Sequence, residues 1–315
     1  MKKSILVLSA LLISLSGISF TLDSIKHDTA WKVGGMVGVN FGQASFTNWA
    51  AGGQNSLSVG SLLTLHANYK KGNNSWDNSL ELAYGMLQVG SAPLQKNEDK
   101  IDFSSMYGHK AFKQWNYAVL LNFKSQFANG YNYPNDSVVV SHFMAPAYVV
   151  GSMGMDYKTK DNHLSFYLSP VTSKTTIVND QRLANEGAYG VKPAQYDTVN
   201  GVYGIRQYGQ KVLYQFGGYL KFAYRVEIFK NVTFATKLDL FSNYLKDPQN
   251  IVVNWENILT MKVNKFLVAT VSTNMIYDNN VPVPVTRTID GISVLGTGPR
   301  LQFKEVLAVG VSYKF

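Results

Sequence analysis

The stretch that decides the fold is Val212-Leu213-Tyr214-Gln215-Phe216-Gly217-Gly218-Tyr219-Leu220-Lys221-Phe222-Ala223-Tyr224-Arg225-Val226-Glu227-Ile228. Every second residue from Val212 to Ile228 is apolar, aromatic or glycine, whereas Gln215, Lys221, Arg225 and Glu227 lie between them. A period of two is that of a β-strand, so one face of this strand can lie in hydrocarbon and the other cannot. Strands of soluble proteins are mostly about 5–6 residues long. Alternation alone also fits a soluble sandwich, but the length favours a strand that crosses a membrane.

The same alternation recurs along most of the chain. After the tight turn at 229–231, apolar side chains again occupy every second position as far as Tyr244. We predict twelve such strands, with fourteen as the alternative count. They are expected at residues 31–43, 54–70, 75–89, 100–108, 114–127, 142–157, 162–173, 212–228, 232–244, 251–263, 266–278 and 301–315.

The connections between these strands alternate in length. Short ones fall around 70–75, 108–114, 158–162, 229–231 and 263–266, and long ones around 45–54, 90–100, 128–141, 178–211 and 279–300, with 245–250 as the exception. Outer-membrane barrels have short periplasmic turns and long extracellular loops. The pattern therefore predicts an all-β protein, in which residues 31–315 form a single transmembrane antiparallel β-barrel domain with long extracellular loops.

The two ends of the sequence indicate export from the cytoplasm and insertion into the outer membrane. A positively charged Met1–Lys3, a short apolar run and small residues at Gly17 and Ser19 indicate a signal peptide over residues 1–19. The apolar run is too short for a membrane anchor. Residues 20–30 are expected to be a short periplasmic segment. The last strand ends on Tyr313 and Phe315, which resembles the signal read by the barrel-assembly machinery. We expect the outer membrane of a Gram-negative bacterium.

Composition narrows the function classes. The 315 residues carry a net charge of +9, only 16% charged side chains, 13% aromatics and no Cys. A mean hydropathy of −0.07 argues against a helical membrane protein. The basic surplus favours contact with outer-membrane lipid and lipopolysaccharide over nucleic acid. Five scattered His residues indicate no metal site, and no cofactor or catalytic residue is expected. His142, beside Ser141, is the only mild candidate for a hydrolase, and a polar residue at the edge of a loop is the preferred interpretation.

In each predicted strand, the positions between the apolar residues should face the lumen; we call this the lumen parity of the strand. They carry both signs of charge in similar numbers, so we expect them to pair across the lumen and close it, although a narrow pore remains an alternative. The predicted lumen-lining residues are Lys32, His66, Asp77, Glu81, Lys124, Lys221, Arg225, Glu227, Lys237, Asp239, Glu256, Lys262 and Lys304.

Two loops carry further hypotheses. In the loop at 45–55, Asn48, Trp49, Gly52 and Gly53 form a candidate contact surface for a protein partner, because an exposed Trp on a flexible loop suits recognition. Trp49 as a girdle or inward-folded residue is the alternative. In the loop at 178–211, Asn179 or Asp180 is expected to cap a short helix over Gln181–Asn185, which Gly187 ends. We expect that loop to fold over or into the barrel mouth, a mobile surface loop being the alternative.

Three stretches resemble a known family. They are Trp31–Ser56 with its Asn48-Trp49-Ala50-Ala51-Gly52-Gly53-Gln54 run, residues 99–131, and residues 168–191 with Ser169-Pro170 and Ser173-Lys174. Together they resemble an uncharacterised Bacteroidetes-type outer-membrane β-barrel family, catalogued as a domain of unknown function. Met106 departs from the basic residue found in relatives. The resemblance implies an outer-membrane barrel and supplies no activity or catalytic residue.

Three functions follow as hypotheses. The first is a non-enzymatic structural or assembly partner of another envelope protein. The second is a narrow passive channel for small solutes. The third, a barrel hydrolase, is a distant alternative.

Overall fold

The computed structural model describes residues 30–45, 54–199, 202–289 and 292–315. The predicted signal peptide, nearly all of the segment at 20–30 and the contact residues Asn48, Trp49, Gly52 and Gly53 therefore lie outside the described residues. In the described part of the chain, no helix is long and apolar enough to cross a membrane.

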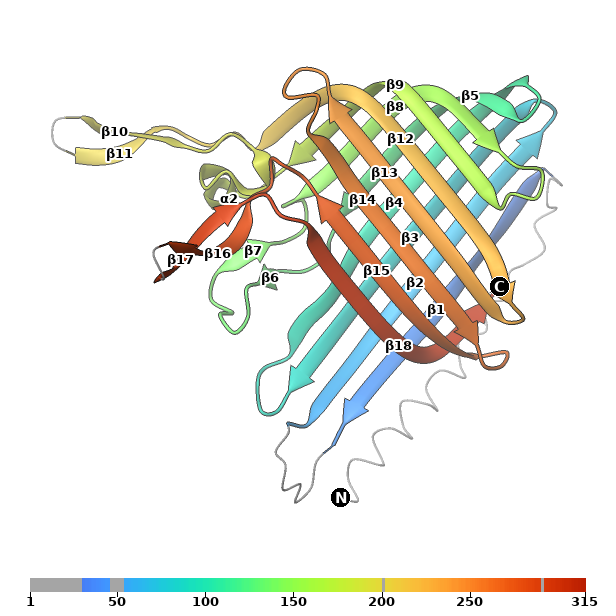
Figure 1. Ribbon diagram of the computed structural model, residues 1–315, viewed down its shortest axis with the longest axis horizontal. Helices are drawn as coiled ribbons and strands as arrows, with labels where there is room; N and C mark the ends of the chain where they lie inside the picture. Colours follow the sequence, from blue (N-terminus) through green and yellow to red (C-terminus); the bar gives the residue numbers. More distant parts are fainter. Residues whose placement is uncertain (1–29, 46–53, 200–201, 290–291) are drawn as a thin grey trace. The chain divides into compact units, whose positions relative to one another are not determined.

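Twelve antiparallel strands close into a barrel, as the sequence predicts (Figure 1). Closure joins the first strand to the last, where Met36 lies opposite Lys314 and Asn40 opposite Gly310. The strands are β1 (Trp31–Ala44), β2 (Ser56–Lys71), β3 (Asn74–Val89), β4 (Gln95–Phe112), β5 (Trp115–Ser125), β8 (Ala147–Lys158), β9 (Leu164–Ile177), β12 (Val212–Phe229), β13 (Val232–Asn243), β14 (Ile251–Lys262), β15 (Leu267–Tyr277) and β18 (Gln302–Lys314).

The largest differences from the predicted strand bounds lie in β4, β8 and β9. Strand β4 ends at Phe112, four residues beyond its predicted end. Strand β4 begins at Gln95 instead of residue 100, because its charged first residues bond to a neighbouring loop and break the alternation. Residues 142–146 form a tight turn instead of the start of a strand, with reciprocal backbone bonds between His142 and Ala145. Strand β9 continues to Ile177, four residues beyond its predicted end.

The connections divide the barrel into two ends. The short-turn end carries residues 72–73, 113–114, 159–163, 230–231 and 263–266, and the long-loop end carries the other six connections. Three long connections contain small sheets that the sequence pattern did not predict. These are the hairpins β6–β7 (Gly130–Tyr131, Val139–Ser141), β10–β11 (Gln195–Val199, Val202–Gln207) and β16–β17 (Val283–Ile289, Ile292–Gly298). Their strands are too short or lack clear alternation, so pattern alone misses them.

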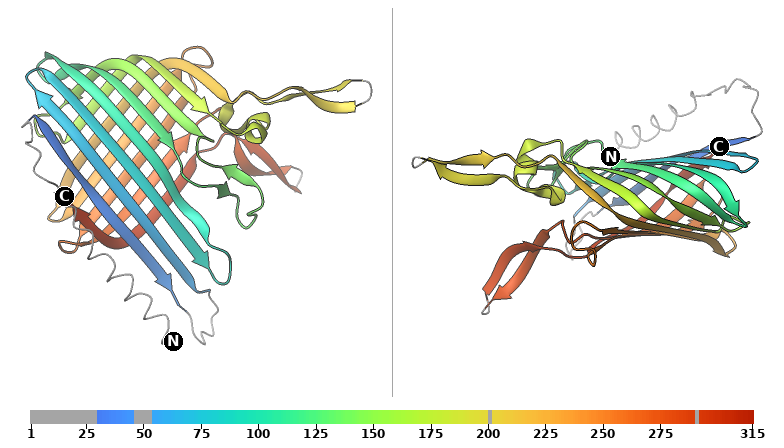
Figure 2. Two further views of the ribbon diagram at one scale, coloured as in Figure 1. Left: turned by 180° about the vertical axis from the view of Figure 1, so that it is seen from behind. Right: turned by 90° about the horizontal axis from the view of Figure 1, so that it is seen from above.

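The barrel has its apolar side chains on the outside. On β18 every second side chain is apolar and exposed over residues 307–315, including Tyr313 at 58% and Phe315 at 54%. The polar residues of the alternate face point into the lumen, where Asn122, Ser152, Lys174 and Gln215 are buried. This reversal suits a barrel whose outer wall contacts hydrocarbon. The slanted strands form a continuous wall when viewed from behind and from above (Figure 2).

A bulge in β9 explains the Ser169-Pro170 element. Met153 lies opposite Val171 and Met155 opposite Leu168, so β9 has one extra residue against β8. The Ser169 hydroxyl donates to the carbonyl of Met153 at 2.7 Å and fills the place of a ladder bond. A Cβ on Gly154 would lie 2.1 Å from the carbonyl oxygen of Leu168, so only glycine allows this approach.

Candidate functional site

The lumen is crossed by ion pairs that join one wall to another. Lys100 on β4 lies 3.0 Å from Glu81 on the neighbouring β3 and 3.5 Å from Glu256 on β14. In the ring of twelve strands, β4 and β14 are six steps apart in either direction, so these strands form opposite walls. The Lys100–Glu256 pair therefore spans the full lumen.

A second bridge lies beside the first. The Lys124 ammonium on β5 lies 3.6 Å from Asp102 on β4 and 3.7 Å from Asp239 on β13, which is four strands from β5. Asn122 donates to Asp102 at 2.8 Å, and the Tyr219 hydroxyl donates to Asp239 at 2.7 Å. Each carboxylate thus has a cation and a neutral donor, the arrangement that compensates charges removed from bulk water.

Further bridges lie along the barrel. Lys158 on β8 pairs with Asp77 on β3 and, at 3.2 Å, with Asp156 on its own strand. Lys304 on β18 pairs with Glu98 on β4. Lys174 on β9 lies 3.4 Å from Asp278, which follows β15. The bridges link strands that are three or four apart in the ring, so the lumen is spanned at several levels.

The structure brings many of the predicted lumen residues together. Asp77, Glu81, Lys124, Asp239, Glu256 and Lys304 take part in the bridges. Lys221 lies opposite Asp239, and Lys237 lies opposite Glu256, in the strand register. The ring of His66 lies against Gly34. The remaining four, Lys32, Arg225, Glu227 and Lys262, lie exposed near the short-turn end and outside this network.

Sequence reasoning missed several charged residues of the bridges, among them Asp278, the last residue of a predicted strand. Lys100 lies at the first residue of a predicted strand, with the same parity as Asp102, and that parity could have placed it in the lumen. Glu98, Lys158 and Lys174 lie just beyond predicted strand ends, so their parity was not considered.

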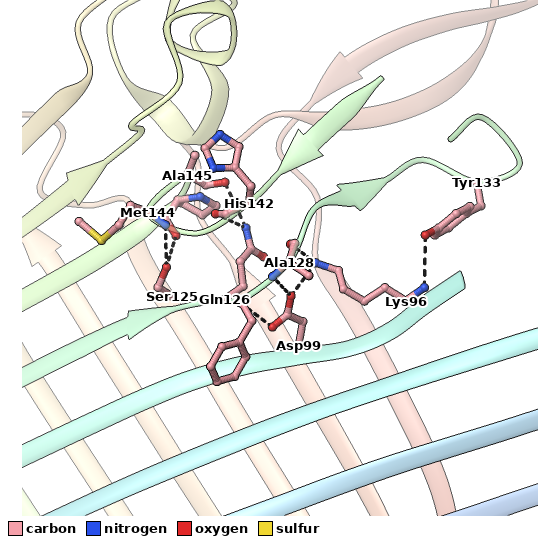
Figure 3. A network of polar contacts seen from close by, with 11 residues as sticks. Lys96, Asp99, Ser125, Gln126, Ala128, Tyr133, His142, Met144 and Ala145 are labelled. Carbon is pink, nitrogen blue, oxygen red and sulfur yellow. Dashed lines mark hydrogen bonds and ion pairs between the residues drawn. The ribbon is translucent and has the colours of Figure 1, made fainter. Parts of the chain in front are cut away.

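The long-loop end is tied down by a polar network (Figure 3). The Asp99 carboxylate on β4 accepts the backbone N–H groups of Phe127 and Ala128, at 2.7 and 2.9 Å, and pairs with Lys96 at 2.7 Å. The Gln126 amide donates to the carbonyls of His142 and Ala145, at 3.0 and 3.1 Å. These bonds fix both ends of the connection between β5 and β8.

The connection between β9 and β12 packs on that fixed loop. Its helix α2 (Gln181–Asn185) begins at Asp180, whose carboxylate accepts the N–H of Leu183 at 3.0 Å, as the sequence predicts. That bond holds the pKa of Asp180 below its usual value. Gly187 follows with φ of 73°. The shared apolar core consists of Ala145, Val178, Leu183, Ala184 and Val191.

Tyr189 anchors the turn that follows α2. It lies in the 3₁₀ turn η2 (Ala188–Gly190), and its hydroxyl donates to the carbonyl of Val140 at 2.6 Å. Burial raises the pKa of Tyr189 to about 12. This phenol therefore stays protonated at neutral pH and serves as a donor that joins the two loops.

The histidine weighed for hydrolysis has both ring nitrogens occupied. Nδ1 of His142 lies 2.9 Å from the carbonyl oxygen of Phe143, and Nε2 lies 3.2 Å from the Asp180 carboxylate. Neither nitrogen contacts Ser141, so these two residues do not form a nucleophile–base pair. Within the described ranges, no group of three His, Asp or Glu side chains is arranged to hold a metal ion.

Comparison with known proteins identifies a family over part of the chain. Residues 41–131 match the sequence profile of a family described as a protein of unknown function (DUF3078), which confirms the resemblance over this part. The comparison with curated proteins found no match.

Solved outer-membrane barrels are similar in structure at low sequence identity. An outer membrane channel from Pseudomonas putida F1 is 11% identical, with a TM-score of 0.38, over 93% of this chain and 100% of that chain. The NanC porin is 11% identical, with a TM-score of 0.34, over 90% and 100%. The translocator domain of the autotransporter NalP from Neisseria meningitidis is 10% identical, with a TM-score of 0.34, over 100% and 98%.

Proposed function

We propose that this protein is a non-enzymatic barrel of the Gram-negative outer membrane that acts as a structural or assembly partner of another envelope protein. The observation that carries the proposal is the set of ion pairs across the lumen, above all Lys100–Glu256 and Lys124–Asp239. Side chains that bridge opposite walls obstruct a through-pathway for solutes. A barrel closed in this way offers its surface, not its lumen, for function.

The hairpin β10–β11 supplies a suitable surface. It forms a sheet separate from the barrel and projects beyond the long-loop end (Figures 1 and 2). Tyr196 lies opposite Ile205 in the register, and its ring stacks on Tyr203 with a centroid distance of 5.5 Å. These three side chains share one face and are 49%, 39% and 70% exposed, for Tyr196, Ile205 and Tyr203 respectively.

The opposite face of the hairpin is charged. Asp197 and Arg206 lie 3.5 Å apart across the two strands. A two-stranded hairpin is only marginally stable alone in water, and exposed Tyr side chains are common anchors of protein interfaces. We therefore assign the aromatic face to a protein partner at the cell surface.

Substitutions in the hairpin test this assignment. We expect the double variant Tyr196→Ser/Tyr203→Ser to lose its partner, because each anchor removed costs roughly 2 kcal/mol or more of binding free energy. The measurement is cross-linking in intact outer membranes, followed by mass spectrometry of adducts on the hairpin. Asp197→Asn/Arg206→Gln, on the other face, is the matched control and should keep the adducts. Unchanged adducts in the tyrosine variant would refute the contact role.

A narrow passive channel is the second candidate. It is favoured by the partial exposure of the bridging side chains, which is 29% for Lys124, 24% for Lys100 and 17% for Glu256. Water therefore reaches these groups from within the lumen. Ion conductance separates the two functions, because a partner role needs none.

Catalysis is not part of the proposed function. The support is the occupied ring of His142, with bonds to Phe143 and Asp180. Release of fatty acid from phospholipid by the purified protein, abolished in His142→Ala, would contradict this statement.

Assembly is proposed to proceed through the last strand. Tyr313 and Phe315 present stacked rings on the outer wall, 6.4 Å apart, and the Phe315 N–H and carbonyl both pair with Gly35 on β1. Before the barrel closes, the last strand presents an aromatic signal. After closure, it is hydrogen-bonded to β1. Removal of Phe315 should lower the amount of folded barrel in outer membranes. The folded fraction is measured by heat modifiability, the difference in gel migration between unheated and heated samples. An unchanged amount of folded barrel would contradict the role of the last strand in assembly.

A further inference from the structure

The outer wall of the barrel contains a groove that the proposed function does not use. Its volume is about 930 Å³, and its lining is formed largely by outward-facing apolar and aromatic side chains. Tyr117 and Met153, at 61% and 62% exposure, are the most exposed of its large apolar side chains. Residues that define it on successive strands are Tyr107, Val119, Met153, Leu168, Leu220 and Leu240.

The groove crosses the wall from one end of the barrel to the other. Along the hydrogen-bonded register, Tyr117 lies opposite Met155, which lies opposite Leu168, and Leu168 lies opposite Leu220. The lining begins at Trp115, beside the β4–β5 turn of the short-turn end, and reaches Tyr244, at the long-loop end. The strands are tilted (Figure 2), so a row of pairs that runs across them passes obliquely through the wall.

The β9 bulge lies within the groove. Pro170, within the bulge, and Gly218, on the adjoining strand, both line the groove. Gly218 carries no side chain on the outward face, and the Tyr244 hydroxyl lies 2.5 Å from the position a Cβ would take there. The Tyr244 ring therefore lies over Gly218 and takes the space that a side chain there would need.

The short-turn end of the groove has the chemistry of a lipid headgroup region. Trp115 packs on Tyr157 and Phe166, with ring centroids 5.2 and 6.4 Å away. His109 Nδ1 lies 2.8 Å from Asn74 Oδ1, and the Tyr107 hydroxyl donates to the same oxygen at 3.0 Å. Aromatic rings with polar edges are typical of the membrane interface.

The turns beside this end carry excess positive charge. Lys113 in the β4–β5 turn and Lys160 in the β8–β9 turn are exposed. The two turns lie side by side, because the Lys158 N–H donates to the carbonyl of Gln114. The one acidic side chain of these two turns, Asp161, lies 3.1 Å from His163. Each lysine near the membrane surface raises the affinity for an anionic headgroup by about fivefold.

We propose that this groove binds one anionic diacyl phospholipid, with an acyl chain in the groove and the phosphate beside Lys113 and Lys160. An apolar groove in the hydrocarbon layer is filled by chains, and a chain in a groove makes more contacts than one on a convex wall. The lysines supply the second signal, since apolar and electrostatic terms act together in lipid binding. This site is independent of the hairpin contact.

Native mass spectrometry of the purified, delipidated full-length mature barrel tests the site. We expect addition of palmitoyl-oleoyl phosphatidylglycerol to give one retained lipid, bound more tightly than phosphatidylcholine with the same chains. Lys113→Gln/Lys160→Gln should weaken the binding of phosphatidylglycerol by about tenfold or more and leave the binding of phosphatidylcholine unchanged. Equal retention of both lipids by the wild type would overturn the headgroup assignment.

A pair of valines provides a matched control for the groove itself. Val119 lines the groove and Val309 lies on the outer face of β18 outside it, and both are 48% exposed. Val119→Trp should abolish the retained lipid, whereas Val309→Trp should keep it. Loss or retention in both variants, or a mass corresponding to two protein chains at this site, would overturn the proposal. Both variants are first shown to be folded by heat-modified gel migration.

Discussion

Gly154→Ala is expected to destabilise the barrel by about 3 kcal/mol, because its new Cβ would lie 2.1 Å from the carbonyl oxygen of Leu168. The obstructing atom belongs to the backbone, so no side-chain rotation relieves the contact. The β9 strand would have to move away from β8 and break the bond from Ser169 to Met153. Equilibrium unfolding by urea in lipid vesicles, followed by tryptophan fluorescence, measures the change.

Gly151 provides the control on the same strand. A Cβ added there has no heavy atom within 4 Å, so Gly151→Ala should change the free energy of unfolding by less than about 0.5 kcal/mol. Similar losses for the two variants would mean that the bulge does not depend on a close approach at Gly154.

Lys124→Met is expected to cost about 2 kcal/mol of stability, since it leaves Asp102 and Asp239 in the lumen without their shared cation. Methionine keeps much of the length and apolar volume of the lysine chain, so the loss reports on charge more than on packing. The half-buried location places the expected cost below that of a fully buried pair. The same urea unfolding experiment applies.

Two further variants isolate the charge effect. Lys113→Met, at an exposed turn, removes a lysine without breaking a bridge and should change stability by less than about 0.5 kcal/mol. Adding Asp239→Asn to Lys124→Met should recover part of the loss, because one unpaired carboxylate is removed. No recovery in the double variant would contradict the bridge as the source of stability.

The barrel could be predicted from the sequence because a lipid-facing wall imposes alternation along every strand. In β12 each outward residue contacts hydrocarbon and each inward one contacts the lumen, so the pattern in residues 212–228 is read directly. The alternation ends where strands leave this environment. At Gln95–Asp99 the side chains bond to a loop, and the start of β4 was therefore placed five residues late.

The loops and the bridges were predictable in different degrees. The cap at Asp180 is a local effect and was found, whereas the hairpin at 195–207 has short strands that pattern cannot separate from loop. The alternation along a strand predicts that a residue faces the lumen, but it does not predict which residue across the lumen forms an ion pair with it. The Lys100–Glu256 pair joins residues 156 apart in sequence, and only closure of the barrel brings them together.

Single-channel recording of the wild-type barrel in planar lipid bilayers is the most direct measurement of whether the ion pairs close the lumen. The account predicts no stable unitary current steps from protein that heat-modified gel migration shows to be folded. Steady, ohmic steps of uniform size from that same preparation would mean an open water path past Lys100 and Lys124. Such a result would contradict the closed lumen and favour the passive channel.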